Sequence, residues 1–106
     1  MAELDDSRLL LAFDYGTRRL GVATANMTTR TASPLTTLRV DRDLPWSEID
    51  RVVADWRPAQ IVVGLPAGEG TEAVAARVRS FVAALERRYD VPVATVDETL
   101  TSVAAL

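Results

Sequence analysis

The chain contains no cysteine, no histidine and no lysine among its 106 residues. Without cysteine, disulfides, thiolate nucleophiles and zinc–thiolate sites are all excluded. Without histidine and lysine, acid–base chemistry is left to carboxylates, tyrosine and water. Arginine supplies every basic side chain, so any phosphate contact would be an arginine contact, which is planar and bidentate.

Long apolar runs are also missing. None approaches the roughly 18 residues that a membrane span needs. The first six residues, Met1 to Asp6, carry acids where a signal peptide carries basic residues. The sequence therefore predicts a cytoplasmic protein with no membrane partner.

The residues that are present suit one folded domain. A content of 48% hydrophobic and 25% charged residues is that of an ordinary globular protein, and the length suffices for a single core. Residues 1–7 are expected to be a flexible lead-in, and residues 8–106 a single domain. The net charge of −3 argues against non-specific coating of nucleic acid, but it leaves room for a local basic patch.

The first half of the chain predicts three strands and a helix. Residues 9–13 form an apolar run that suits a central strand, and residues 19–25 alternate as a second strand of a β-hairpin. Residues 31–40 suggest a third strand, which Pro34 places at the edge of the sheet. For the helix that ends before Pro58, Ser47 is the expected N-cap, with Asp50 reaching back as in a capping box. Its apolar face is expected to hold Ile49, Val52, Val53 and Trp56.

The second half predicts two parallel strands joined by a long helix. Residues 60–64 and 91–96 read as strands, and residues 71–89 keep helical spacing of apolar positions. A last helix is expected to start at Thr101. The order β-β-β-α-β-α-β predicts an α/β fold with a mixed five-stranded sheet, three antiparallel strands followed by two parallel ones. That is an RNase H-like topology with a truncated C-terminal helix.

Three carboxylates are the strongest candidates for chemistry. Asp14 ends the first apolar run, and Asp97 and Glu98 follow the last strand. A carboxylate that closes a buried strand sits in a low dielectric and favours a cation partner. Because ligands bind at the C-terminal ends of parallel strands, these side chains are expected to meet there. A divalent ion such as Mg²⁺ would relieve their repulsion and activate water for phosphodiester attack.

Structural interpretations of the same acids stay open. An aspartate before a glycine often belongs to a turn, which is the alternative for Asp14. Asp97 and Glu98 could instead supply negative charge to a helix N-terminus. The glycine-rich loop at 64–70 lacks the P-loop signature, so phosphate cradling and simple flexibility are both consistent with it.

Basic and aromatic residues add a second set of candidates. Arg18 and Arg19, with Thr17, lie beside Asp14 in the sequence and could hold a nucleic-acid backbone, although solvated arginines are common in hairpins. Trp46 and Trp56 are expected to pack against the core rather than to stack on bases.

Four segments in order resemble the YqgF (RuvX) family. They are Leu11-Ala12-Phe13-Asp14-Tyr15-Gly16-Thr17-Arg18-Arg19-Leu20-Gly21-Val22-Ala23, Ala32-Ser33-Pro34-Leu35, Ile61-Val62-Val63-Gly64-Leu65-Pro66 and Val96-Asp97-Glu98-Thr99-Leu100-Thr101-Ser102. The resemblance covers roughly residues 8–106 and implies an RNase H-like fold. It also implies Mg²⁺- or Mn²⁺-dependent phosphodiester hydrolysis, with Asp14 as the first-strand metal ligand and an acid of the Asp97-Glu98 pair as the second. The implied substrate is precursor rRNA, at the 5′ end of pre-16S rRNA, or branched DNA at a Holliday junction.

This sequence departs from the family pattern in three places. Thr99 stands where the family usually has an arginine, and the segment Ala67 to Gly70 lacks the usual Asn and Asp-Gly-Ser. Family members also continue into a basic stretch and a final helix with another catalytic aspartate. On this comparison the site is expected to be incomplete, and whether the chain is an enzyme stays open.

Two rival hypotheses come from other classes. Asp14-Tyr15-Gly16-Thr17 fits the first phosphate loop of the actin-like ATPases and sugar kinases, although those proteins need two such domains. A non-catalytic RNase H-like module that binds nucleic acid is the third reading. Metal-dependent cleavage would separate them. Apolar sheet surface left uncovered by an absent last helix would also favour a homodimer.

Overall fold

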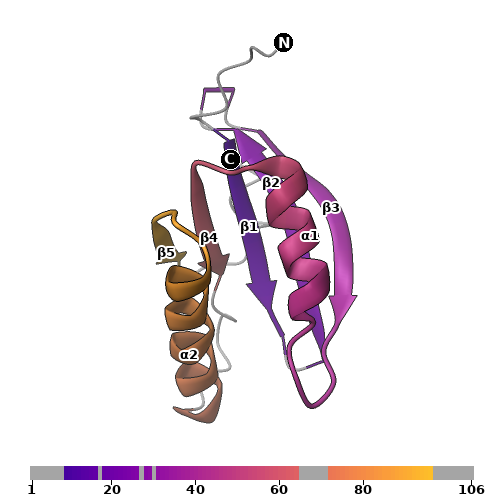
Figure 1. The fold of residues 1–106 in the computed structure, drawn as a ribbon, viewed down its shortest axis with the longest axis vertical. Coiled ribbons are helices and arrows are strands. Elements are labelled where there is room, and N and C mark those ends of the chain that lie inside the picture. Colours follow the sequence, from indigo (N-terminus) through magenta and orange to yellow (C-terminus); the bar gives the residue numbers. More distant parts are fainter. Residues whose placement is uncertain (1–8, 17, 27, 30, 65–71, 97–106) are drawn as a thin grey trace.

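The computed structural model describes residues 9–16, 18–26, 28–29, 31–64 and 72–96. Within these ranges five strands and two helices follow one another along the chain (Figure 1). In order they are β1 (Leu9–Tyr15), β2 (Arg19–Asn26), β3 (Thr31–Arg39), α1 (Trp46–Trp56), β4 (Gln60–Gly64), α2 (Glu72–Arg88) and β5 (Val93–Val96).

The strands form one mixed sheet in the order β3-β2-β1-β4-β5, with β1 at its centre. β2 pairs antiparallel with both β1 and β3, whereas β4 pairs parallel with β1 and β5. The predicted arrangement of three antiparallel and two parallel strands is confirmed. Pro34 does lie on an edge strand, next to an irregularity in the pairing of β2 with β3, which are the positions where sheets tolerate proline.

Both helices pack on one face of the sheet, in front of the strands in Figure 1. The core contains alternate residues of β1, namely Leu11, Phe13 and Tyr15, because side chains alternate between the two faces of a strand. Phe81 of α2 lies at the middle of this core. Its ring centroid is 5.6 Å from that of Phe13, at an interplanar angle of 82°, which is the favoured edge-to-face arrangement of aromatic rings.

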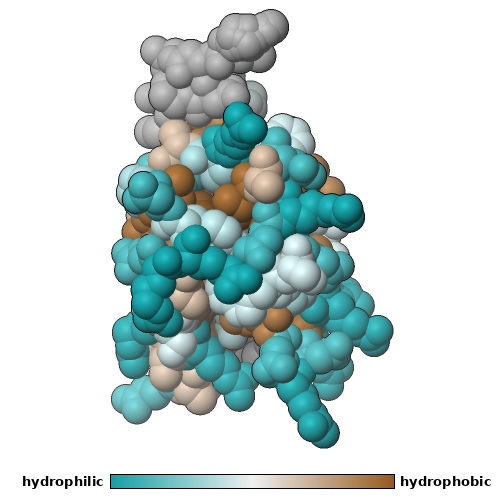
Figure 2. Space-filling model, in the orientation of Figure 1, coloured by the Kyte–Doolittle hydropathy of each residue, from teal (hydrophilic) through white to brown (hydrophobic). Residues whose placement is uncertain are grey.

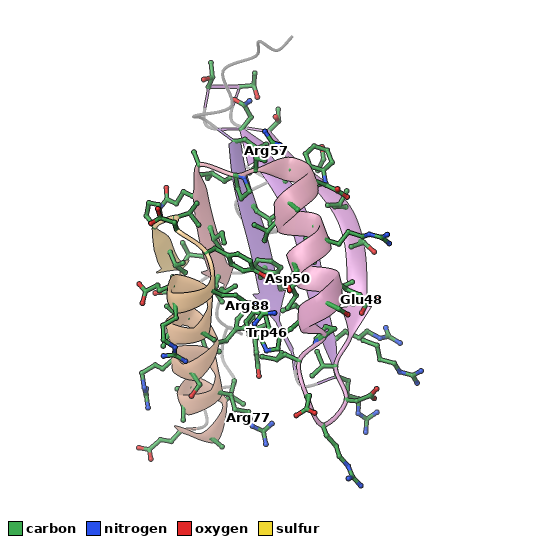
Figure 3. All side chains as sticks on the ribbon, in the orientation of Figure 1. Trp46, Glu48, Asp50, Arg57, Arg77 and Arg88 are labelled. Carbon is green, nitrogen blue, oxygen red and sulfur yellow. The ribbon has the colours of Figure 1, made fainter. Side chains whose placement is uncertain are left out.

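The start of α1 differs from the prediction. The helix begins at Trp46, with Pro45 as its N-cap and no side-chain cap hydrogen bond. Ser47 therefore lies inside the first turn, and the expected cap is wrong. Asp50 does not reach back to the helix start either, because it binds Arg88 of α2 (Figure 3). A long-range charged partner outcompetes the weak local capping contact.

The remaining predictions for α1 are largely confirmed. Ile49 is fully buried, and Val52 and Val53 pack partly against the core, but Trp56 is 39% exposed. Trp56, in the last turn of the helix, is not among the residues packed against the core, so the prediction that it packs there is wrong. The helix ends before Pro58, as expected.

The second half of the chain follows the prediction closely. Val78, Phe81 and Leu85 form the buried stripe of α2. β5 starts later than predicted, at Val93, because Pro92 has no N–H for the ladder; its carbonyl still accepts a hydrogen bond of 2.9 Å from Ile61 N. Neither described helix is long and apolar enough to cross a membrane. The helix expected from Thr101 lies outside the described residues.

Candidate metal and nucleic-acid site

Asp14 lies one residue before the end of the central strand β1. Its neighbours Phe13 and Tyr15 belong to the core beneath the helices. Because side chains alternate along a strand, the Asp14 side chain emerges on the opposite side of the sheet. We call this side the open face, since neither α1 nor α2 packs on it. The prediction that Asp14 closes a buried strand at its C-terminal end is confirmed.

Glycines flank Asp14 on both neighbouring strands. Its antiparallel partner on β2 is Gly21 and its parallel partner on β4 is Gly64. A Cβ atom built on Gly21 would lie 3.4 Å from Asp14 Cβ, in van der Waals contact with it. With glycine on each side, neither neighbouring strand places a Cβ atom beside Asp14 in this row.

The Asp14 carboxyl group is half-buried, and burial raises its pKa above the ordinary value of 3.8. Desolvation penalises the charged form, and a nearby cation would offset that penalty. Carboxylate oxygens are the ligands that Mg²⁺ and Mn²⁺ prefer. However, the described residues contain no group of three acidic or other metal-binding side chains close together. The Asp14 carboxylate therefore has the chemistry of a single ligand for such an ion.

The predicted partners, Asp97 and Glu98, lie outside the described residues. The last described residue, Val96, pairs with Gly64, which itself pairs with Asp14. At a strand spacing of about 4.8 Å, Val96 lies about 10 Å from Asp14 along this row of the sheet. The meeting of the three carboxylates remains a prediction.

Arginines gather beside Asp14 where β1 turns into β2. Arg18 and Arg19 are exposed and line a polar groove of about 620 Å³. Thr17, the third predicted contact, lies outside the described residues. The opposite wall of the groove is formed by residues of β3 and by those just after it, which were not identified from the sequence. The complete lining is Arg18, Arg19, Thr37, Arg39, Val40 and Asp41.

A larger hollow of about 870 Å³ lies on the helix side of the sheet. It is bounded by the segment before α1 and by α2, and its lining includes Tyr15, Trp46 and Arg77. On this side hydrophilic side chains cover most of the surface (Figure 2). Trp46, which lines the hollow, also packs against the core as predicted, because its ring centroid lies 5.8 Å from that of Phe81. Because Asp14 and Tyr15 point to opposite faces, this hollow is separate from the Asp14 carboxylate.

Comparisons with known proteins agree with this geometry. Residues 8–106 match the profile of the RuvX family, described as Holliday junction resolvase. A protein of Pseudomonas putida named "Putative pre-16S rRNA nuclease" is 42% identical over 103 residues, which cover 94% of this chain and 73% of that protein. A protein of the same name from Marinobacter nauticus is 45% identical over 102 residues, covering 93% of this chain and 71% of that protein.

Two solved structures share the fold at low sequence identity. Thermus thermophilus RuvC, solved in complex with a Holliday junction, aligns with a TM-score of 0.52 at 20% identity, over 83% of this chain and 63% of RuvC. Archaeoglobus fulgidus Pelota aligns with a TM-score of 0.59 at 12% identity, over 86% of this chain and 26% of Pelota. Together with the three-plus-two sheet, the RuvC likeness confirms the RNase H-like fold. The family match over residues 8–106, and relatives above 40% identity, show that this chain belongs to the RuvX family.

Proposed function

We propose that this chain is a metal-dependent nuclease of the cytoplasm that hydrolyses phosphodiester bonds in structured nucleic acid, with precursor 16S rRNA as its substrate. Residues 8–106 would form its single domain. The observation that carries the proposal is the position of Asp14. A half-buried carboxylate stands at the C-terminal end of the central strand, between two glycines, on a face that no described helix covers.

The pleat of the sheet favours Glu98 over Asp97 as the partner of Asp14. Val96 stands in the same row as Asp14, through Gly64, so the two residues share a face of the sheet. Every second residue of a strand returns to the same face. A strand continued in this register would present Glu98 on the open face with Asp14, and Asp97 on the helix side. We therefore assign Asp14 and Glu98 as the pair that would hold Mg²⁺ or Mn²⁺.

Two groups of residues would have separate roles, one in binding the metal ion and one in binding the substrate. Asp14 and Glu98 would hold the ion, and Arg18 and Arg19, next to Asp14, would hold the nucleic-acid backbone through charge-assisted hydrogen bonds. When bound, a divalent ion supplies a water molecule of lowered pKa and neutralises charge on the phosphate. Gly21, which is partly exposed and has no side chain, would let the sugar–phosphate backbone approach the sheet beside Asp14.

Metal binding by itself tests the assignment of ligands. We expect Mn²⁺ to raise the melting temperature of the chain, because a ligand that binds only the folded state stabilises it. Asp14→Asn and Glu98→Gln should abolish this rise, whereas Asp97→Asn should keep it. Equal losses in the Asp97 and Glu98 variants would contradict the assignment made from the pleat.

Cleavage tests the proposed reaction. The chain is incubated with a precursor rRNA fragment, with Mn²⁺ or with EDTA, beside the Asp14→Asn variant. We expect cleavage only with the wild-type chain and Mn²⁺. Binding of RNA without any cleavage would instead support the non-catalytic module.

Holliday junction resolution is the second candidate, because the family profile carries that description. The same assay with a four-way DNA junction separates the two substrates. Paired symmetric nicks across the junction, faster than cleavage of the precursor RNA, would favour the resolvase. A resolvase must cut two strands, so we would then also expect the chain to be a homodimer in sedimentation velocity experiments.

A further inference from the structure

The groove beside Asp14 contains an unusual pair of like charges. Arg19 of β2 and Arg39 of β3 are direct partners in the antiparallel register, and both are exposed. Like charges placed directly opposite each other destabilise a strand pair. In the described part of the chain neither arginine forms an ion pair, although Asp41 also lines the groove. A bound anion would remove this repulsion.

The register places these arginines on the same face as Asp14. Asp14 pairs with Gly21, which pairs in turn with Thr37, so the three residues form one row. Arg19 is two residues before Gly21, and Arg39 is two residues after Thr37. Because every second residue shares a face, Arg19, Thr37 and Arg39 all stand on the open face with Asp14.

No side chain stands between Asp14 and Thr37 in this row, because the residue between them is Gly21. The two ends of the row are about 10 Å apart, at about 4.8 Å per strand. A nucleic-acid strand advances about 3.4 Å per nucleotide along a duplex axis, so a few nucleotides span this distance. A backbone bound at Asp14 could therefore continue across Gly21 into the groove.

From these observations we infer that Arg19, Thr37 and Arg39 form a phosphate-binding subsite for the same nucleic-acid strand whose phosphodiester lies at Asp14. This inference rests on the proposed function and names the path of the substrate. The two guanidinium groups would each bind a phosphate oxygen pair, and the Thr37 hydroxyl would donate one further hydrogen bond. The contacts are with the backbone, so they do not depend on base sequence.

A purely structural role for Arg39 makes a different prediction. Charged side chains on edge strands protect sheets from pairing with other chains. That role requires a charged residue on β3, but it does not require an arginine opposite it on β2. If Arg39 only protects the edge, neutralising it should cause aggregation and should leave nucleic-acid binding unchanged.

Binding to labelled nucleic acid tests the subsite. Fluorescence anisotropy is measured in EDTA, so that nothing is cleaved, with a four-way DNA junction and with a precursor rRNA fragment, over a series of salt concentrations. The variants are Arg19→Gln, Arg39→Gln and Thr37→Val. Arg51→Gln is the matched control, because Arg51 is an exposed arginine on α1, which packs on the other side of the sheet.

We expect Arg19→Gln and Arg39→Gln each to weaken binding about tenfold, as loss of a charge-assisted hydrogen bond does. Each should also lower the slope of log affinity against log salt by about 0.9 for the DNA junction. Thr37→Val should weaken binding without changing the slope, and Arg51→Gln should change neither. Melting temperatures of the two glutamine variants should equal or exceed that of the wild type, because a repulsion is removed.

The subsite and the proposed function can fail separately. If Arg39→Gln binds as tightly as Arg51→Gln, or if the wild-type chain does not bind either probe, the subsite is wrong even where Asp14-dependent cleavage is observed. If binding depends on Arg19 and Arg39 but no cleavage occurs with Mn²⁺, the subsite holds and the nuclease proposal fails. Aggregation of Arg39→Gln with unchanged affinity would assign Arg39 to edge protection.

Discussion

Arg88 of α2 forms a bidentate ion pair with Asp50 of α1. Its Nε and Nη2 atoms donate hydrogen bonds of 2.7 Å to Oδ1 and Oδ2 of the carboxylate (Figure 3). The Tyr89 hydroxyl donates a further hydrogen bond to Oδ1, and the Arg88 guanidinium carbon lies 4.9 Å from the centroid of a Trp46 ring. One arginine thus joins the two helices through a pair of residues that are 38 positions apart in the sequence.

Replacing Arg88 should loosen the contact between the helices. Lysine keeps the charge but cannot form the two parallel hydrogen bonds or lie flat on the indole ring. We therefore expect Arg88→Lys to lower the melting temperature, and Arg88→Ala to lower it further. Both Arg88 and Asp50 side chains are 43% exposed, so the effect should be modest and should shrink at high salt. Arg87→Ala, which removes a neighbouring exposed arginine, is the control and should melt as the wild type does.

The same ion pair should make stability depend on pH in the acid range. The hydrogen bond from Arg88, followed by that from Tyr89, lowers the pKa of Asp50 from 3.8 to about 2. A lowered folded-state pKa stabilises the protein above the unfolded-state value, and that stability is lost as the pH falls from about 4 to about 2. The difference in melting temperature between the wild type and Asp50→Asn should therefore shrink over this window. A difference that stays constant down to pH 2 would contradict the assignment.

Asp14 should show the opposite dependence. Burial raises its pKa above 3.8 in the folded state, so the folded state holds this proton more tightly than the unfolded chain does. Stability from this group is complete below about pH 3.8 and is lost as the pH rises through the folded-state pKa. In EDTA at pH 7 we expect Asp14→Asn to be at least as stable as the wild type. Thermal melts of both chains between pH 3 and pH 8 measure this, and a marked loss of stability in Asp14→Asn at pH 7 would assign Asp14 a structural role.

The sequence was sufficient to predict the order of strands and helices and the mixed sheet, because the local apolar patterns match the residues that form the core. The apolar run before Asp14 favoured a strand at the centre of the sheet, and the spacing of apolar residues in α2 favoured a helix that packs on that sheet. At Asp50 a long-range contact overrides a local rule. The spacing from Ser47 predicts a capping residue, but its partner, Arg88, is far away in the sequence.

The arginine groove could not be predicted for a comparable reason. Counted outward from the β2–β3 turn, where Asn26 pairs with Thr31, Arg19 would fall opposite Leu38. An irregularity between Val22 and Ala23 shifts the register by one residue, so Arg19 meets Arg39 instead. A one-residue shift exchanges the two faces of a strand. Leu35, next to Pro34, is the residue that this pairing skips. Proline in a strand indicates either an edge or a bulge, so it does not decide on which side Arg39 lies.

A single methyl group should cost more at Gly16 than at Gly21. A Cβ atom built there would lie 2.7 Å from the Arg19 carbonyl oxygen, a backbone atom that cannot rotate away. We expect Gly16→Ala to force the turn between β1 and β2 open and to destabilise the fold by about 1–3 kcal/mol, as overpacking does. Gly21→Ala is the matched control. Its Cβ would make an ordinary contact of 3.4 Å with Asp14 Cβ, and alanine in a strand gains about 0.5 kcal/mol over glycine. Urea unfolding followed by circular dichroism compares the two free energies, and equal stabilities would show that the turn tolerates a side chain.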